Sequence, residues 1–144
     1  MNIFQAAGFF FTNNWLQILV STLAGLVIGG VWYGPIFGKT WKKLVGIEKL
    51  SKDKQEQMMK YGMASNIIGT VLQVLILGTV LSQMQILNFV NMVMAIFLLW
   101  LGFTFITLNS INIYSARPLK ATLINSGYAL LVWVVTGAIF YFWY

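Results

Sequence analysis

Gly25-Leu-Val-Ile-Gly-Gly-Val-Trp-Tyr-Gly-Pro-Ile-Phe-Gly-Lys-Thr-Trp41 joins the end of an apolar segment to an aromatic pair, a proline and the first lysine of the chain. This order is typical of a transmembrane helix that leaves the bilayer, because Trp and Tyr favour the interface and lysine favours the cytoplasmic side. Pro35 cannot continue a helix and disfavours helical geometry at the residue before it. We therefore expect the first span to end at Tyr33.

The composition indicates a membrane protein. Of the 144 residues, 59% are hydrophobic and only 8% are charged, whereas a soluble domain carries about 25% charged residues. Four apolar segments reach or exceed the roughly 20 residues that cross a bilayer. We predict an all-α fold, an integral membrane four-helix bundle formed by residues 1–144 as one domain, with spans at residues 15–33, 61–81, 92–113 and 121–142.

The positive charges predict how the bundle lies in the membrane. All nine Lys and Arg residues fall in the two loops 34–60 and 114–120. By the positive-inside rule both loops are cytoplasmic and both termini are outside, in the plasma (inner) membrane.

The first of these loops is expected to contain a short amphipathic helix on the membrane surface. Phe37, Trp41, Leu44 and Val45 would share one face of that helix. The lysines that lie mostly off this face are expected to contact lipid headgroups: Lys39, Lys42 and Lys43.

The residue types exclude most enzyme chemistry. The chain has no cysteine and no histidine, and its three acidic residues lie in the loop between Glu48 and Glu56. Without histidine it lacks the commonest metal ligand and the usual general base. We expect no catalytic residues, no metal and no cofactor, and lipid rather than nucleic acid as the partner of the basic charge.

Amide and hydroxyl side chains are predicted to form one polar layer. Asn66, Asn109 and Asn125 each lie five residues into the membrane from a residue at the cytoplasmic interface, which is about 7 Å at 1.5 Å per residue. These interface residues are Tyr61, Tyr114 and Lys120, respectively. These groups either bond between helices or line a cytoplasm-facing path, and we favour the first interpretation. The set is Asn66, Thr70, Gln73, Asn109, Asn112, Asn125, Ser126 and Tyr128.

Small residues follow the first span at helical spacing. Ser21, Gly25 and Gly29 recur at every fourth position, and Gly30 follows directly. Small residues on one helix face let a neighbouring backbone approach closely. Glycine is also simply common in membrane helices, but because the spacing repeats we expect these four residues to pack closely against a neighbouring helix.

Two motifs resemble a known family. The first is Gly30-x-Trp32-Tyr33-Gly34-Pro35-x-Phe37-Gly38-Lys39-x-Trp41 followed by Gly46, and the second is Arg117-Pro118 followed by Ile124-Asn125-Ser126-Gly127-Tyr128. In this order they resemble the domain of unknown function 1761 family over nearly the whole chain. The resemblance implies a small four-span membrane protein, chiefly microbial, and it brings no established activity or catalytic residues.

Three functions stay open at this point. The favoured one is a non-enzymatic structural or accessory bundle that forms a homo-oligomer through the face of Ser21, Gly25 and Gly29. The second is a passive channel or permease for a small ion or neutral solute along the asparagine layer. The third is an anionic-lipid-binding protein that uses the lysines near Trp41.

Overall fold

The computed structural model describes residues 2–84 and 88–143. These residues form helices joined by short links, with no strand among them. Four of the helical segments are long and apolar enough to cross a membrane: Trp15–Ile36, Lys52–Gln83, Phe89–Tyr114 and Leu119–Phe142. Each contains one of the predicted spans. The predicted turn between the second and third spans includes residues 85–87, which lie outside the described residues.

The first span continues past the predicted end at Tyr33. Helix α2 (Trp15–Val31) is extended by the π-helical turn η1 (Trp32–Ile36), which contains Pro35. The Phe37 amide donates to the Trp32 carbonyl over 2.9 Å, an i→i+5 bond. This wider turn accommodates the ring of Pro35, whose missing N–H would break an α-helix.

The basic loop of residues 34–60 is largely helical. Helix α3 (Gly38–Val45) ends at Gly46, whose φ of +79° is left-handed and favours glycine. A 3₁₀ turn, η2 (Ile47–Lys49), follows. Helix α4 (Lys52–Gln83) then runs without a break from the loop through the second span.

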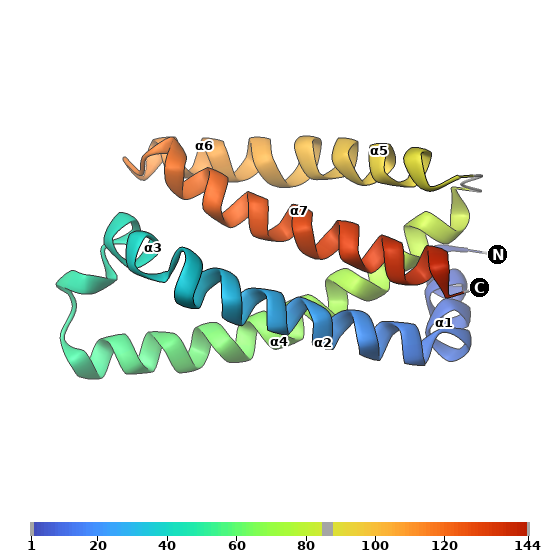
Figure 1. Cartoon of the computed structure of the whole chain (residues 1–144), viewed down its shortest axis with the longest axis horizontal. Coiled ribbons are helices and arrows are strands. Elements are labelled where there is room, and N and C mark those ends of the chain that lie inside the picture. Colours follow the sequence, from blue (N-terminus) through green and yellow to red (C-terminus); the bar gives the residue numbers. More distant parts are fainter. Residues whose placement is uncertain (1, 85–87, 144) are drawn as a thin grey trace.

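The last two spans are antiparallel neighbours. The third consists of α5 (Phe89–Leu99), the π-helical turn η3 (Trp100–Phe105) and α6 (Ile106–Tyr114), and it is joined to α7 (Leu119–Phe142) by a tight link. Within that link Ala116 has a φ of +53°. An additional helix, α1 (Ile3–Asn13), crosses the start of α2 at a steep angle (Figure 1).

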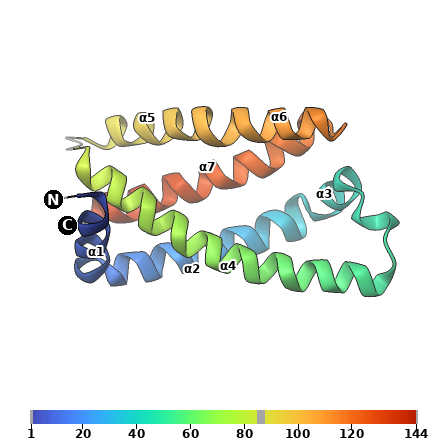
Figure 2. The ribbon, with the colours of Figure 1, turned by 180° about the vertical axis from the view of Figure 1, so that it is seen from behind.

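Helix α7 is the central element of the fold. It packs against α2 on one side and against α5 and α6 on the other, and the later part of α4 crosses near its C-terminal half (Figures 1 and 2). Two apolar clusters hold this arrangement together. One contains Phe10, Ile18 and Val74, and the other contains Leu77, Met92 and Ile96.

The first part of α4 departs from a closed bundle. The helix diverges from α2 as both approach the end that carries α3 (Figures 1 and 2). From Lys52 to Ile68 every side chain is exposed except Gln55, which is half-buried, whereas Thr70, Val74 and Leu77 are buried. The four spanning helices therefore pack together as the expected bundle only toward the end that carries the termini.

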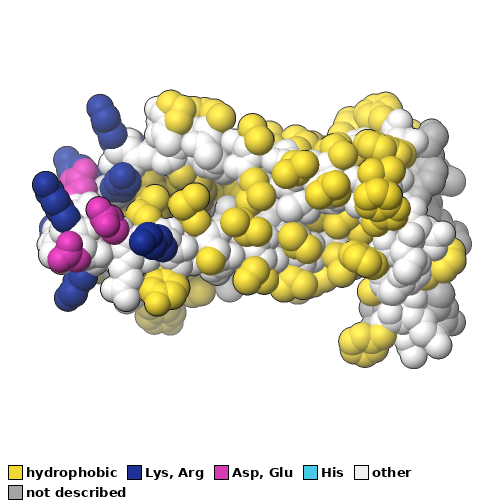
Figure 3. Space-filling model, turned by 90° about the horizontal axis from the view of Figure 1, so that it is seen from below, with side chains coloured by type: hydrophobic (Ala, Val, Ile, Leu, Met, Phe, Trp, Pro, Cys, Tyr) yellow, Lys and Arg dark blue, Asp and Glu magenta, His cyan; other side chains and the backbone are white. Residues whose placement is uncertain are grey.

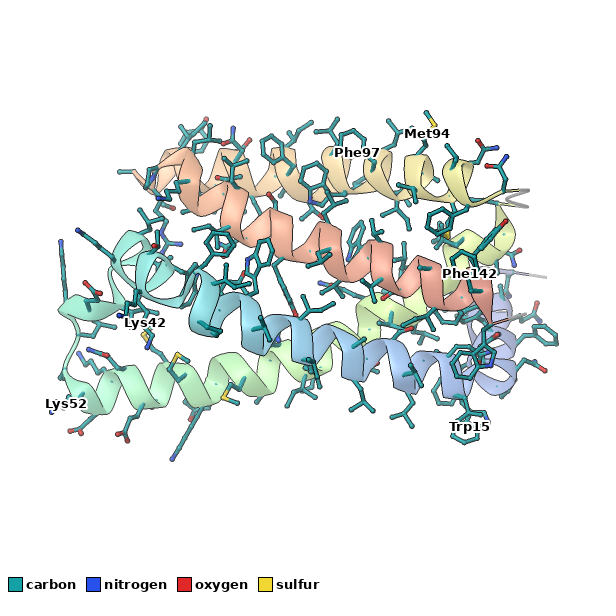
Figure 4. All side chains as sticks on the ribbon, viewed as in Figure 1. Trp15, Lys42, Lys52, Met94, Phe97 and Phe142 are labelled. Carbon is teal, nitrogen blue, oxygen red and sulfur yellow. The ribbon has the colours of Figure 1, made fainter. Side chains whose placement is uncertain are left out.

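The charged side chains gather at one end of the molecule (Figure 3). Lys42 and Lys52 lie at this end, whereas Trp15 and Phe142 lie at the opposite end, near both termini (Figure 4). Between the two ends the surface is largely apolar, and Met94 and Phe97 point outward from α5 (Figure 4). Both basic loops thus lie on the same side of the spans.

Candidate functional site

The side chain of Asn125 connects the exit of the first span to the fourth span. Its Oδ1 accepts hydrogen bonds from the Tyr33 hydroxyl (3.0 Å) and from Trp41 Nε1 (2.9 Å). An indole N–H only donates, so the carbonyl oxygen of the amide must face Trp41. η1, α3 and α7 therefore meet at one amide.

Aromatic rings surround this amide. The ring of Tyr33 lies edge-on to those of Trp41 and Tyr128, with centroids 5.3 Å apart in both cases. Trp32 stacks at a tilt on Phe37 (4.7 Å), and its Nε1 donates to the Ile124 carbonyl over 3.0 Å. Edge-to-face pairs of this kind add to the stability that burial alone provides. We call Tyr33, Trp41, Asn125 and Tyr128 the asparagine junction.

Glycines provide the space for these rings. A Cβ on Gly29 would lie 3.1 Å from the Tyr128 hydroxyl, and that hydroxyl donates to the Gly25 carbonyl over 3.2 Å. A Cβ on Gly127 would lie 3.3 Å from Trp32. A Cβ on Gly38 would lie 2.5 Å from the Tyr33 carbonyl oxygen, a backbone atom that cannot give way.

The two motifs therefore contact each other in space. Gly30 and Gly34 are exceptions, because nothing lies within 4 Å of a Cβ built on either one. In the second motif, Pro118 occupies the N-cap position of α7, and the Arg117 amide donates to the Asn112 carbonyl over 2.8 Å. This part of the motif shapes the link between α6 and α7.

Other members of the predicted polar layer bond in separate pairs. Asn112 is buried and donates to the Thr122 hydroxyl over 3.0 Å. Gln73 accepts from Trp133 Nε1 over 3.3 Å. The Thr70 hydroxyl donates to the carbonyl of Asn66 in its own helix.

Asn66 itself does not join the asparagine junction. Its side chain is exposed and makes no hydrogen bond to any described residue, and that of Asn109 is half-buried and also makes none. The hydroxyl of Ser126 is buried without a hydrogen-bond partner among the described residues, while the Ser126 carbonyl accepts from Trp100 Nε1 over 2.6 Å. The structure thus brings Asn125 and Tyr128 together and leaves Asn66 apart from them.

The small residues of the first span pack inside the chain. Ser21, Gly25 and Gly29 are buried, whereas Gly30 is exposed. A Cβ on Gly25 would lie 2.9 Å from Thr70 and 3.1 Å from Val132. The face that was expected to contact a second copy is therefore occupied by α4 and α7 of the same chain.

The lysines of α3 lie directly beside the asparagine junction. Lys39 and Lys43 are exposed and Lys42 is half-buried, while Trp41 between them is held by Asn125. No group of three His, Cys, Asp or Glu side chains comes together among residues 2–84 and 88–143. The groups present at the site are an amide, an indole, two phenols and the neighbouring ammonium groups.

Sequence reasoning did not find the hydrogen bonds that define the junction. It placed Tyr33 and Trp41 in one motif and Asn125 in a polar layer, without linking them. It also passed over Trp100, although an indole N–H in the middle of a span needs an acceptor and so points to a contact.

The chain belongs to the family described as protein of unknown function (DUF1761), whose model matches residues 16–141. The matched region contains both motifs and all four residues of the asparagine junction. The resemblance found from the motifs is therefore confirmed. No curated protein and no solved structure matches the chain.

Proposed function

We propose that this member of the family is a non-enzymatic accessory membrane protein that binds anionic lipid headgroups at its charged end. One observation carries the proposal: Asn125 accepts from Trp41 and Tyr33, and so fixes the basic helix α3 against α7. The backbone that carries the lysines on either side of Trp41 is thereby held against α7. A receptor that is ordered in advance loses less conformational entropy when it binds.

The energetics of the lysines support a headgroup site. A lysine near an anionic membrane surface contributes about 1 kcal/mol of attraction. Lys39, Lys42 and Lys43 lie within five residues of one another on α3, and none of them forms an ion pair with a described residue. Their charges are therefore available to phosphate groups.

The amide of Asn125 adds a polar group to this site. Both of its bonds use Oδ1, and no described residue accepts a hydrogen bond from Nδ2. A headgroup phosphate oxygen is a strong acceptor and bonds such N–H groups with charge assistance. Asn125 would then both position α3 and donate to the lipid.

This proposal includes an orientation. The charged end faces the cytoplasm and both termini lie outside, in the plasma (inner) membrane. The support is that the Lys and Arg residues lie at one end of the spans (Figure 3), and the positive-inside rule puts such an end in the cytoplasm.

The alternative of a channel gains no support from the contacts. It requires Asn66, Asn109 and Asn125 to line one path. Asn125 is instead bonded to Tyr33 and Trp41, and the side chain of Asn66 is exposed on the part of α4 that diverges from α2.

Lipid retention tests the proposal. The protein is purified in a mild detergent and exchanged into nanodiscs in which phosphatidylglycerol competes with phosphatidylcholine, and bound lipid is counted by native mass spectrometry. The double variant Lys42→Gln, Lys43→Gln is expected to lower the preference for phosphatidylglycerol about 30-fold, from about 1 kcal/mol for each lysine.

The matched control removes two lysines from the exposed start of α4, with Lys52→Gln and Lys54→Gln. These residues lie outside the site, so the loss should be several-fold smaller. If both double variants lost the same preference for phosphatidylglycerol, the preference would come from general surface charge, and the proposal would be overturned. A wild-type protein without any preference for phosphatidylglycerol would overturn it as well.

A further inference from the structure

We infer that a second copy of this chain docks on the first half of α4, with the two α4 helices parallel and Asn66 paired with its counterpart. This surface differs from the one expected from the sequence. The face of Ser21, Gly25 and Gly29 is filled by the chain's own helices, so an interface between copies needs another face.

Among the described residues, little covers the first half of α4, although the side-chain amide of Gln55 donates to the Leu50 carbonyl over 2.9 Å. Every side chain from Lys52 to Ile68 is exposed except the half-buried Gln55. Exposed apolar residues on a spanning helix normally face lipid. A helix that is exposed on all its faces, and that also carries an asparagine below the interface, requires a different explanation.

Asn66 is the residue that indicates a second copy of the chain as the partner of this surface. It lies five residues inside Tyr61, in a segment apolar enough to cross a membrane, and its side chain makes no bond to any described residue. An amide left unsatisfied in hydrocarbon is costly. An amide both donates and accepts, so two asparagines related by a two-fold axis satisfy each other.

The spacing of residues on this half-helix fits a parallel helix pair. Gln55, Met59, Gly62, Asn66 and Gly69 follow one another at intervals of four, three, four and three. This is the 3.5-residue repeat of a left-handed helix pair, in which a polar Asn at one inner position sets the register and favours two strands. Spanning helices cross most often with the same geometry.

The two glycines in this series are open to a close neighbour. No atom of residues 2–84 and 88–143 outside the local helix lies within 4 Å of a Cβ built on Gly62 or Gly69, whereas Gly25 and Gly29 are packed against other helices. Glycines at a helix contact allow two backbones to approach closely. We call Gln55, Met59, Gly62, Asn66 and Gly69 the α4 seam.

Both copies enter the membrane in the same orientation, so a two-fold axis along the membrane normal makes their α4 helices parallel. Each seam residue near the axis then faces itself in the partner. The first half of α4 diverges from α2 at the charged end (Figures 1 and 2). The seam residues are exposed, apart from the half-buried Gln55 and Gly69. The inference does not depend on headgroup binding by α3.

Single cysteines provide a direct test, because the chain has no cysteine of its own. Gly62→Cys lies in the seam, and Ala64→Cys lies two residues on, at nearly the same depth but on the opposite side of the helix. Both positions are exposed in the single chain. After oxidation in native membranes, Gly62→Cys is expected to yield a covalent dimer and Ala64→Cys is not.

Mass photometry or native mass spectrometry in a mild detergent gives the second measurement. The wild-type protein is expected at twice the chain mass of 16.3 kDa. Asn66→Leu is expected to raise the dimer dissociation constant about 3- to 30-fold, the range expected for one amide pair between membrane helices. Asn66→Gln keeps an amide and should lose less.

The possible outcomes separate cleanly. A cross-link at Gly62→Cys alone, together with a dimeric wild type that Asn66→Leu weakens, supports the interface. A monomeric wild type, with or without bound lipid, overturns it. Cross-linking that is equal at the two positions, or stronger at Ala64→Cys, also overturns it, because contact would then be random or on the wrong face.

Discussion

Replacing Asn125 with leucine should release α3 from α7 while leaving the four spans in place. Leucine has a similar volume but offers no acceptor to the Tyr33 hydroxyl at 3.0 Å or to Trp41 Nε1 at 2.9 Å. The Trp32 bond to the Ile124 carbonyl uses the backbone and stays. The change therefore removes two defined hydrogen bonds.

The magnitude follows from those two bonds. Hydrogen bonds between membrane helices contribute about 0.6 kcal/mol on average and up to about 1.7 kcal/mol each. The two bonds together amount to about 1–3 kcal/mol. The Trp41 bond, which joins α3 itself to Asn125, accounts for about 0.6–1.7 kcal/mol, which corresponds to about a 3- to 18-fold larger population in which α3 is detached. Local opening on this scale is visible in amide hydrogen exchange.

The assay is hydrogen–deuterium exchange of the protein in nanodiscs, read on peptides that cover α3. Exchange there should accelerate by the same factor in Asn125→Leu. The control is Asn109→Leu, since Asn109 is half-buried and its side chain makes no hydrogen bond to a described residue. We expect the control to change exchange in α3 by no more than about two-fold.

A double-mutant cycle with Trp41→Phe then isolates one bond, because phenylalanine keeps an aromatic ring but lacks the indole N–H. The coupling energy between Trp41 and Asn125 should be about 0.6–1.7 kcal/mol. Additive effects, or unchanged exchange of α3 in Asn125→Leu, would refute the view that Asn125 holds this helix.

Two further substitutions test the packing and the second polar pair. Gly38→Ala should lower the free energy of unfolding by about 1–3 kcal/mol, because the added Cβ would lie 2.5 Å from the Tyr33 carbonyl oxygen. Gly30→Ala is the control: no described atom outside the local helix lies within 4 Å of its Cβ, so it should leave the free energy of unfolding unchanged or raise it by up to about 1 kcal/mol. Equal effects in a denaturant titration in detergent would contradict this. A cycle of Asn112→Val and Thr122→Val should show a coupling of about 0.6–1.7 kcal/mol for their 3.0 Å bond, and zero coupling in the same titration would argue against it.

The spanning segments were predictable because the properties that identify them sum over the residues of each segment. Hydropathy, interfacial aromatics and the placement of lysines each depend on residue type and not on the neighbouring helix. The unbroken run of α4 through the second span was also predictable, because no proline interrupts Lys52–Gln83. The end of the first span was not, because the π-turn at Pro35 depends on a hydrogen bond to Trp32 that propensity rules do not anticipate.

The polar layer shows where such reasoning stops. Depth follows from the rise per residue, and so Asn66 and Asn125 were predicted to lie at similar distances from the ends of their spans. Which way a side chain faces depends on how its helix is rotated and tilted. Helix α4 diverges from α2 toward the charged end, and Asn66 is exposed and takes no part in the hydrogen bonds at Asn125. No local pattern encodes that divergence.

The junction also has a consequence for the order of assembly. Tyr33 and Trp41 are separated from Asn125 by 92 and 84 residues in the chain, and synthesis proceeds from the N-terminus. The segment around Pro35 thus emerges from the ribosome long before its acceptor exists. The exit of the first span can therefore form its bonds to Asn125 only after the fourth span has been synthesised.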